Sequence, residues 1–364
     1  MKFADQQTRP APFAPARRRL GKTALASGAL IAAAALTTTG CSALHGASGQ
    51  AASGPGGADS MALASSSKTM GLSSVMAASY QIVKLNDARD KTFNQLLGIN
   101  NAGVIAGYFG SGAAGHPNRG YVLIPPFAQH SFLNENFPHG VQTQVTGLND
   151  HGVTVGFWSK QNTASNANNN FGFYEQNGRF HNVNFPIGDA ASPPVDQLLG
   201  VNNHDVAVGF FTNSGGANRG YEYNIRTHRF SRVQIPGAAG LGPSLTAAAI
   251  NNRGDVAGFY NKTSMQVDAF LKLWSGRFIT LAYPGAAMTQ AFGVNDSDEV
   301  VGTYTTGSGN AAVTHGFTWW DGKYTRVNIS GAGSTAINGV NDEGDLVGFY
   351  TDAKGNTDGL LALP

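Results

Sequence analysis

The chain has 364 residues, of which 41% are hydrophobic and 13% are charged, and it contains one cysteine. This length supports a large core that needs no disulfides. Residues 1–40 hold six basic residues and one acidic residue, so residues 41–364 hold 18 basic and 21 acidic residues, a net charge of −3 with His neutral. No basic stripe remains there to bind phosphates, which excludes the usual nucleic-acid-binding classes.

The first 40 residues predict an export signal. A basic stretch at residues 17–22 precedes an apolar run at residues 24–36. That order is typical of a signal peptide, and the run is too short for a permanent membrane anchor. The pattern Arg-Arg-X-Leu-X-Lys also resembles a twin-arginine signal, with the general secretory route as the alternative.

Cys41 is the only cysteine and follows Gly40 directly after the apolar segment. A thiol at this junction resembles the acylated cysteine of a bacterial lipoprotein, with cleavage before Cys41. We therefore expect a cell-envelope lipoprotein, in the periplasm or at the outer membrane, that contacts the membrane only through this anchor. The alternative is an ordinary secretory signal with an incidental cysteine and a secreted product.

Residues 41–78 are dominated by Ala, Ser and Gly and contain almost nothing that can build a core. They predict a flexible tether with a root-mean-square reach of about 35 Å. The globular part is then residues 79–364, which we expect to be a monomer.

A repeated motif organises the globular part. Its reference residue is an asparagine, with Gly two residues before it in five copies and Gly seven residues after it in all six. The asparagines are Asn100, Asn149, Asn202, Asn251, Asn295 and Asn341. Their separations of 49, 53, 49, 44 and 46 residues suit the four-stranded blade of a β-propeller.

Each repeat predicts four short strands. The first ends at the reference asparagine, and an Asn-X-X-Gly turn leads to the second; Asp205 and Asp298 replace that Gly in two copies and also tolerate positive φ. The sixth repeat stops after its third strand, whereas the segment from Tyr80 to Leu85 matches a fourth strand. We therefore predict an all-β, six-bladed β-propeller whose last blade is closed by this N-terminal strand.

The motifs themselves resemble a known family. Asp268-Ala269-Phe270-Leu271 and His315-Gly316-Phe317-Thr318, together with the Gly-apolar-Asn phrase, are similar to the HAF family of bacterial extracellular repeat proteins. The resemblance covers residues 80–364 and implies an exported, propeller-like protein without one assigned reaction. The family's eponymous His is present only at His315, and the other copies carry Arg119, Phe171, Arg219, Asp268 and Asp358.

A polar residue recurs five positions before the reference asparagine. These candidate ligand-binding residues are Gln95, Gln144, Gln197, Thr246 and Gln290, with Ala336 in the sixth copy. If the first strands line the axis, their amides lie near one mouth beside the long polar loops and suit a neutral polar ligand such as a glycan. The alternative is that they hold the incoming loops and fix the blade spacing.

Acidic residues gather in the first turns of the last three repeats. The candidates for a hard-cation site are Asp255, Asp296, Asp298, Asp342 and Asp345. Calcium needs six to eight converging oxygens, which neighbouring blades would have to supply at the axis. The alternative is that these acids satisfy their own turns and face water. We expect no other cofactor.

No catalytic motif is visible: the sequence has no Gly-X-Ser-X-Gly elbow, no His-Glu-X-X-His helix and no phosphate loop. We therefore expect a binding module for a glycan, peptide or protein partner in the bacterial cell envelope. The alternative is a polysaccharide-acting hydrolase or lyase with its site at one rim, because propellers host both classes.

Overall fold

The computed structural model describes residues 80–364 except 114, 163–168, 187, 189, 239 and 241. The predicted export signal, Cys41 and the tether lie outside the described residues. Strands account for nearly all the regular structure, with two short 3₁₀ turns, η1 (Gln129–Ser131) and η2 (Gly309–Ala311). In the part described, no helix is both long and apolar enough to cross a membrane.

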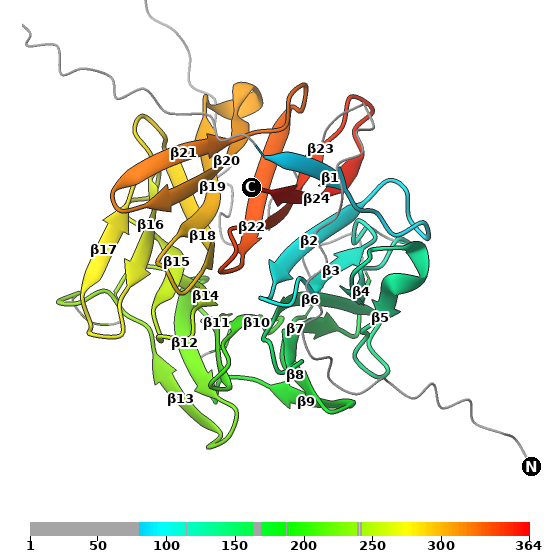
Figure 1. The fold of residues 1–364 in the computed structure, drawn as a ribbon. Helices are drawn as coiled ribbons and strands as arrows, with labels where there is room; N and C mark the ends of the chain where they lie inside the picture. Colours follow the sequence, from blue (N-terminus) through cyan, green and yellow to red (C-terminus); the bar gives the residue numbers. More distant parts are fainter. Residues whose placement is uncertain are drawn as a thin grey trace, which may run out of the picture.

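The described strands form six four-stranded antiparallel units around one axis, which we call blades I–VI in chain order (Figure 1). Blade I contains β2 (Asn94–Ile99), β3 (Ile105–Phe109), β4 (Arg119–Leu123) and β5 (Phe132–Asn134). Blade II contains β6 (Gln142–Leu148), β7 (Thr154–Ser159), β8 (Phe171–Gln176) and β9 (Arg179–Val183). Blade III contains β10 (Asp196–Val201), β11 (Val206–Thr212), β12 (Asn218–Asn224) and β13 (Arg229–Arg232). Blade IV contains β14 (Leu245–Ile250), β15 (Val256–Asn261), β16 (Val267–Lys272) and β17 (Phe278–Leu281). Blade V contains β18 (Met288–Val294), β19 (Val300–Thr306), β20 (Val313–Trp320) and β21 (Lys323–Val327). Blade VI contains β22 (Ser334–Val340), β23 (Leu346–Thr351), β24 (Thr357–Leu363) and β1 (Gln81–Lys84). The all-β, six-bladed propeller predicted from the repeat is therefore confirmed.

The two ends of the described chain close the last blade together. Strand β1 pairs antiparallel with β24, with Gln81 opposite Leu363 and Lys84 opposite Leu360. Figure 1 shows β1 beside β24 at the outer side of blade VI. This is the closure that the sequence predicted, and it covers an edge that β24 would otherwise expose.

The hydrophobic core is divided into layers between neighbouring blades. One cluster joins blade VI to blade I through Val347, Leu361 and Leu96, and another joins blades II and III through Val155 and Leu198. The remaining four interfaces have clusters of the same kind. The apolar residues on both faces of the second strands are explained by this packing, since each sheet is covered on both sides.

A β-bulge explains the glycine that precedes the reference asparagine. In all six blades the pairing of the first two strands shifts by one residue, as between Leu96 and Gly98. A Cβ added at Gly147 would lie 3.1 Å from the Cα of Gly200 in the next blade. Glycine therefore lets the innermost strands approach each other closely.

The glycine seven residues after each reference asparagine also lies where there is no room for a side chain. A Cβ at Gly156 or at Gly209 would lie 2.0 Å from the carbonyl oxygen of Gln144 or Gln197, respectively. No side chain fits at that distance, so glycine is needed here for the close approach of the first two strands. The turn chemistry is confirmed as well, because Asp205 and Asp298 have φ angles of 58° and 61°.

Deleting residues 79–86 should destabilise the whole propeller, because it removes β1 and the buried Leu85 from the blade VI–I interface. Thermal melting followed by circular dichroism should show a large loss of Tm, and a synthetic peptide of residues 79–86 added in excess should restore part of it. A truncated protein that melts like the full chain would refute closure by β1.

Candidate functional site

The six reference asparagines form a continuous belt around the axis, which we call the Asn belt. Each Oδ1 accepts the backbone N–H groups two and four residues later, at 2.8–3.2 Å, and so fixes its own turn. Each Nδ2 donates to the backbone carbonyl of the reference asparagine in the next blade, at 2.9–3.4 Å. The last bond, from Asn341 to the carbonyl of Asn100, closes the circle. One side chain therefore builds a turn and joins two blades.

Asn202→Asp tests the belt at one joint, because it keeps the Oδ1 acceptor but replaces the Nδ2 donor. At neutral pH a buried carboxylate oxygen would face the carbonyl of Asn251, now 3.0 Å from Nδ2. We expect a loss of about 3 kcal/mol in the free energy of unfolding. The loss should shrink at acidic pH, where the protonated carboxyl can donate again.

Urea denaturation at two pH values measures this effect. The matched control is Asn134→Asp. Asn134 is exposed, its Oδ1 accepts a hydrogen bond from Arg89, and Asp at this position keeps that acceptor. Equal stability of Asn202→Asp and the control would show that the belt bonds contribute nothing.

The residues that directly follow the reference asparagines form a second ring of hydrogen bonds between blades. The sequence analysis did not predict this ring. The residue after each reference asparagine is always Asn or Asp, and its Oδ1 accepts the backbone N–H of its counterpart in the preceding blade, at 2.7–3.0 Å. These residues form the Asx ring: Asn101, Asp150, Asn203, Asn252, Asp296 and Asp342. Six Asn or Asp residues at one offset were a visible signal, but only the structure shows their partners.

The acids predicted to bind a cation are mostly engaged in local contacts. Asp255 accepts from the backbone N–H of Trp274 and from the Asn251 amide, and it pairs with Arg253. Burial raises the pKa of Asp255, but these hydrogen bonds outweigh it and hold the pKa below its ordinary value. Arg253 also pairs with Asp298.

The other three candidates lie in the first turns of blades V and VI. Asp296 and Asp342 are neighbours in the Asx ring, and Asp345 accepts from the Asn341 amide. Among the described residues, no group of three or more His, Cys, Asp or Glu side chains is arranged to hold a metal ion. The calcium site therefore stays a prediction without a set of converging ligands to support it.

The polar residues at the start of the inner strands, which we call the amide tier, lie at the opposite end of those strands. Gln95 is five residues from Asn100, about 16 Å along an extended strand. Gln144, Gln197 and Gln290 are half-buried, whereas Gln95 and Thr246 are buried. The long loops after the second strands leave the blades at this same end, so this mouth carries both the amides and the loops.

Several members of the amide tier contact the preceding blade. The amide of Gln144 donates to Asn118 at 2.9 Å, and that of Gln197 donates to Asn170 at 3.4 Å. Thr246 accepts from Asn218 at 3.1 Å, while Gln95 accepts from the hydroxyl of Tyr108 in its own blade. These contacts support a role in blade spacing, and ligand binding by the tier stays a prediction.

His315, the residue that carries the family resemblance, sits in a structural contact. Its Nδ1 accepts from the Asn328 amide at 2.8 Å, so its Nε2 hydrogen points to the hydroxyl of Thr306 at 2.9 Å. Burial and nearby Arg326 lower its pKa, which favours the neutral ring.

One carboxyl group has the pKa that an acid/base catalyst would need. Burial raises the pKa of Asp196 from 3.8 to about 7, against hydrogen bonds from the Tyr221 hydroxyl and the backbone N–H of Phe185. Its side chain is buried between blades II and III, and the residue is only 5% exposed. The equivalent Thr143 accepts a backbone N–H in the same way. We therefore assign Asp196 to stability rather than to catalysis.

The raised pKa of Asp196 predicts a pH-dependent stability. Between the unfolded pKa of 3.8 and the folded value of about 7, the folded state binds more protons, so the free energy of unfolding falls as pH rises, by up to about 4 kcal/mol. Asn mimics the neutral acid, because its amide can donate to Tyr221 and its oxygen can accept from Phe185. The stability of Asp196→Asn relative to wild type should thus increase from pH 4 to 7, measured by urea denaturation. A difference that does not change with pH would contradict the assignment.

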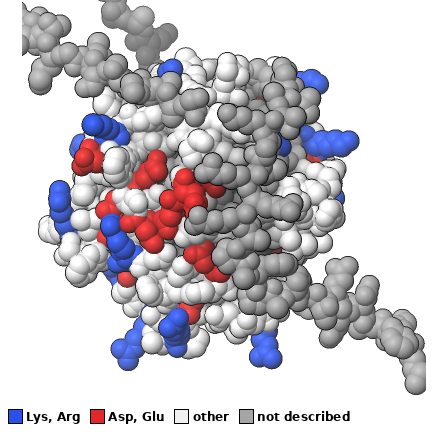
Figure 2. All heavy atoms as spheres, viewed as in Figure 1, with Lys and Arg blue, Asp and Glu red and all other residues white. Residues whose placement is uncertain are grey.

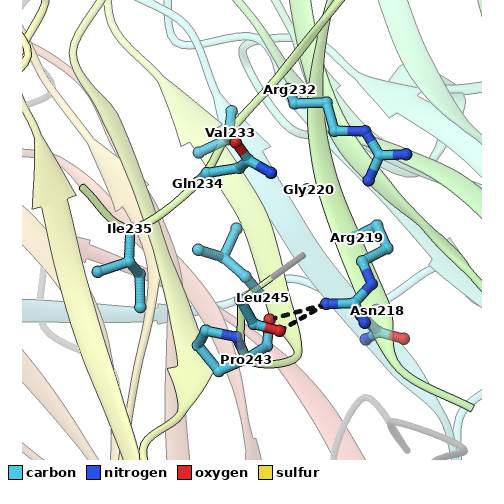
Figure 3. A pocket seen from close by; sticks show the side chains of 10 residues that line it. Asn218, Arg219, Gly220, Arg232, Val233, Gln234, Ile235, Pro243 and Leu245 are labelled. Atoms are coloured by element: carbon cyan, nitrogen blue, oxygen red, sulfur yellow. Dashed lines mark hydrogen bonds between the residues drawn. The ribbon is translucent and has the colours of Figure 1, made fainter. Parts of the chain in front are cut away.

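A small pocket opens at the edge between blades III and IV. Figure 3 shows Arg219, Arg232 and Gln234 around it. The guanidinium of Arg219 donates to the carbonyls of Gly242 and Pro243. The cavity volume is about 10 Å³, enough for about one water molecule, so it is no site for a sizeable ligand as it stands.

Comparison with known proteins assigns no family and finds only distant matches to solved structures. No protein-family model matches the chain, and no curated protein matches it in sequence. Among solved structures, a polysaccharide lyase acting as an ulvan lyase is 13% identical over 74% of this chain and 78% of its own, with a TM-score of 0.42. AofleA from Arthrobotrys oligospora is 9% identical over 78% and 86%, with a TM-score of 0.44. The β-propeller domain of the Trilobed protease from Pyrococcus furiosus is 9% identical over 74% and 93%, with a TM-score of 0.41.

The chain is thus a β-propeller, as its strand pairing shows directly. The distant matches do not tell what it binds or catalyses. The HAF resemblance has no matching family model and stays a prediction.

Proposed function

We propose that the protein is an exported binding module of the HAF type, held in the bacterial cell envelope by a lipid on Cys41. Its ligand is a neutral polar polymer, a glycan, bound at the mouth that carries the amide tier. The export signal and lipoprotein junction in the sequence support the location.

The observation that carries this proposal is the chemistry of that mouth. The half-buried amides of Gln144, Gln197 and Gln290 lie at equivalent positions in three blades. The first two donate hydrogen bonds to Asn118 and Asn170 of the preceding blades. Amide groups offer donors and acceptors without net charge, which matches the many hydroxyls of a sugar chain. The bordering loops are rich in Gly, Ser, Thr and Asn and can adapt to an extended ligand.

A triple variant, Gln144→Ala with Gln197→Ala and Gln290→Ala, tests the proposal. Each amide lost from a ligand contact removes about 1 kcal/mol, so glycan affinity should fall by about a hundredfold while Tm changes little. The mature protein is first screened against a glycan array and cell-envelope polysaccharides, and the affinity of each variant for the best ligand is then measured by calorimetry.

The matched control is Gln95→Ala, which removes the buried amide that accepts from Tyr108. It should lower Tm and leave glycan affinity unchanged. A triple variant that binds as well as wild type would reject the site. Release of shortened products from a labelled polysaccharide would show that the protein is a hydrolase or lyase instead of a binding module. Selective binding of a peptide or protein at this mouth would reject a glycan as the ligand.

A further inference from the structure

Two tryptophans of neighbouring blades expose most of their side chains. Trp274 is 72% exposed and Trp320 is 59% exposed. Trp274 lies in the hairpin after β16, and Trp320 ends β20. In an antiparallel blade, the hairpin between the third and fourth strands lies at the same end as the turn between the first and second. Both indoles therefore belong to the face of the Asx ring, opposite the amide tier.

Hydrogen bonds attach both tryptophans to the first turns, and ion pairs connect the two turns. The backbone N–H of Trp274 donates to Asp255 at 2.8 Å, and the indole Nε1 of Trp320 donates to the carbonyl of Ser297 at 3.0 Å. Between them, Arg253 pairs with both Asp255 and Asp298. We call the surface formed by Trp274, Trp320 and the turn residues 253–254 and 296–298, which these contacts connect, the tryptophan face.

The surroundings of the tryptophan face are strongly negative. The first turns of blades IV–VI (residues 251–255, 295–299 and 341–345) contain seven acidic residues and one basic residue, Arg253. Asp342 and Glu343 are exposed, and Arg253 is already paired with two carboxylates. Figure 2 shows acidic side chains gathered beside the centre of one face, whereas the basic ones lie mainly toward its edge. Large exposed indoles next to this charge fit a cationic partner.

We propose that the tryptophan face docks an extended Lys- or Arg-containing segment of a partner protein. Guanidinium or ammonium groups stack on the indoles, while Asp296, Asp342 and Glu343 attract the segment and neutralise its other charges. This surface is separate from the amide tier, so its partner is a second ligand, and the proposal does not depend on glycan binding.

The test uses the mature protein and a short fluorescent peptide of alternating Arg and Ser. Matched peptides replace Arg by Gln or by Glu. The Arg peptide should bind and quench tryptophan emission, and the Gln and Glu peptides should not. Raising the salt concentration from about 50 mM to about 500 mM should weaken binding more than tenfold, because exposed charges are screened.

Point variants locate the site. Trp274→Ala and Trp320→Ala should each weaken binding about two- to fivefold. Asp296→Asn combined with Asp342→Asn and Glu343→Gln should weaken it about tenfold at low salt and flatten the salt dependence. Asn already stands at three of the other four Asx-ring positions, so the changes at Asp296 and Asp342 keep the Oδ1 acceptors.

The control variant is Met265→Ala, which removes an 85% exposed side chain from a loop at the opposite end. It should bind like wild type, and thermal melting verifies the fold of every variant. Absence of binding, equal binding of the Gln or Glu peptide, or variants that bind like wild type would each overturn the proposal. So would a polysaccharide that binds these indoles and excludes the peptide.

Discussion

The side chain of one repeated asparagine is the constraint on which the rest of the propeller depends. Its oxygen holds the turn of its own blade, and its amide nitrogen reaches the backbone of the next blade. Because the two functions occupy different atoms of the same group, Asp, Ser and Thr cannot replace it without loss: Asp lacks the donor, and Ser or Thr is too short for both contacts. The glycines before and after it remove the side chains that would keep the strands apart.

This arrangement explains why the architecture was readable from the sequence. Asparagine and glycine act through local geometry, so their fixed offsets predicted the blades, the turns with positive φ at Asp205 and Asp298, and the closing strand. The direction in which each Asn amide points was not predictable, because its acceptor lies about one repeat away in the chain. The bulge at Gly98 and the contacts of Asp196 were also missed, because strand register and the directions of buried side chains are set by packing.

The candidate sites were only partly predictable. The sequence identified the amide tier as a set, but not its division into half-exposed Gln144, Gln197 and Gln290 and buried Gln95, which depends on packing. It identified the acidic first turns, but not that Arg253 ties two of their acids together or that Trp274 and Trp320 flank them. The two mouths therefore differ in charge: the amide tier is neutral, and the Asx-ring face is acidic. The two proposed ligands differ in the same way, since one is a neutral glycan and the other a cationic peptide segment.

Hydrogen exchange measured by mass spectrometry on the purified protein tests the closed belt most directly. The backbone N–H groups of the six Asx-ring residues each donate across a blade interface beside the belt, so they should exchange with similar, slow rates in all blades, including Asn101 and Asp342 on either side of the seam. Their exchange should require opening of the whole ring. Much faster exchange at the seam than in blades II–V would contradict a continuous belt.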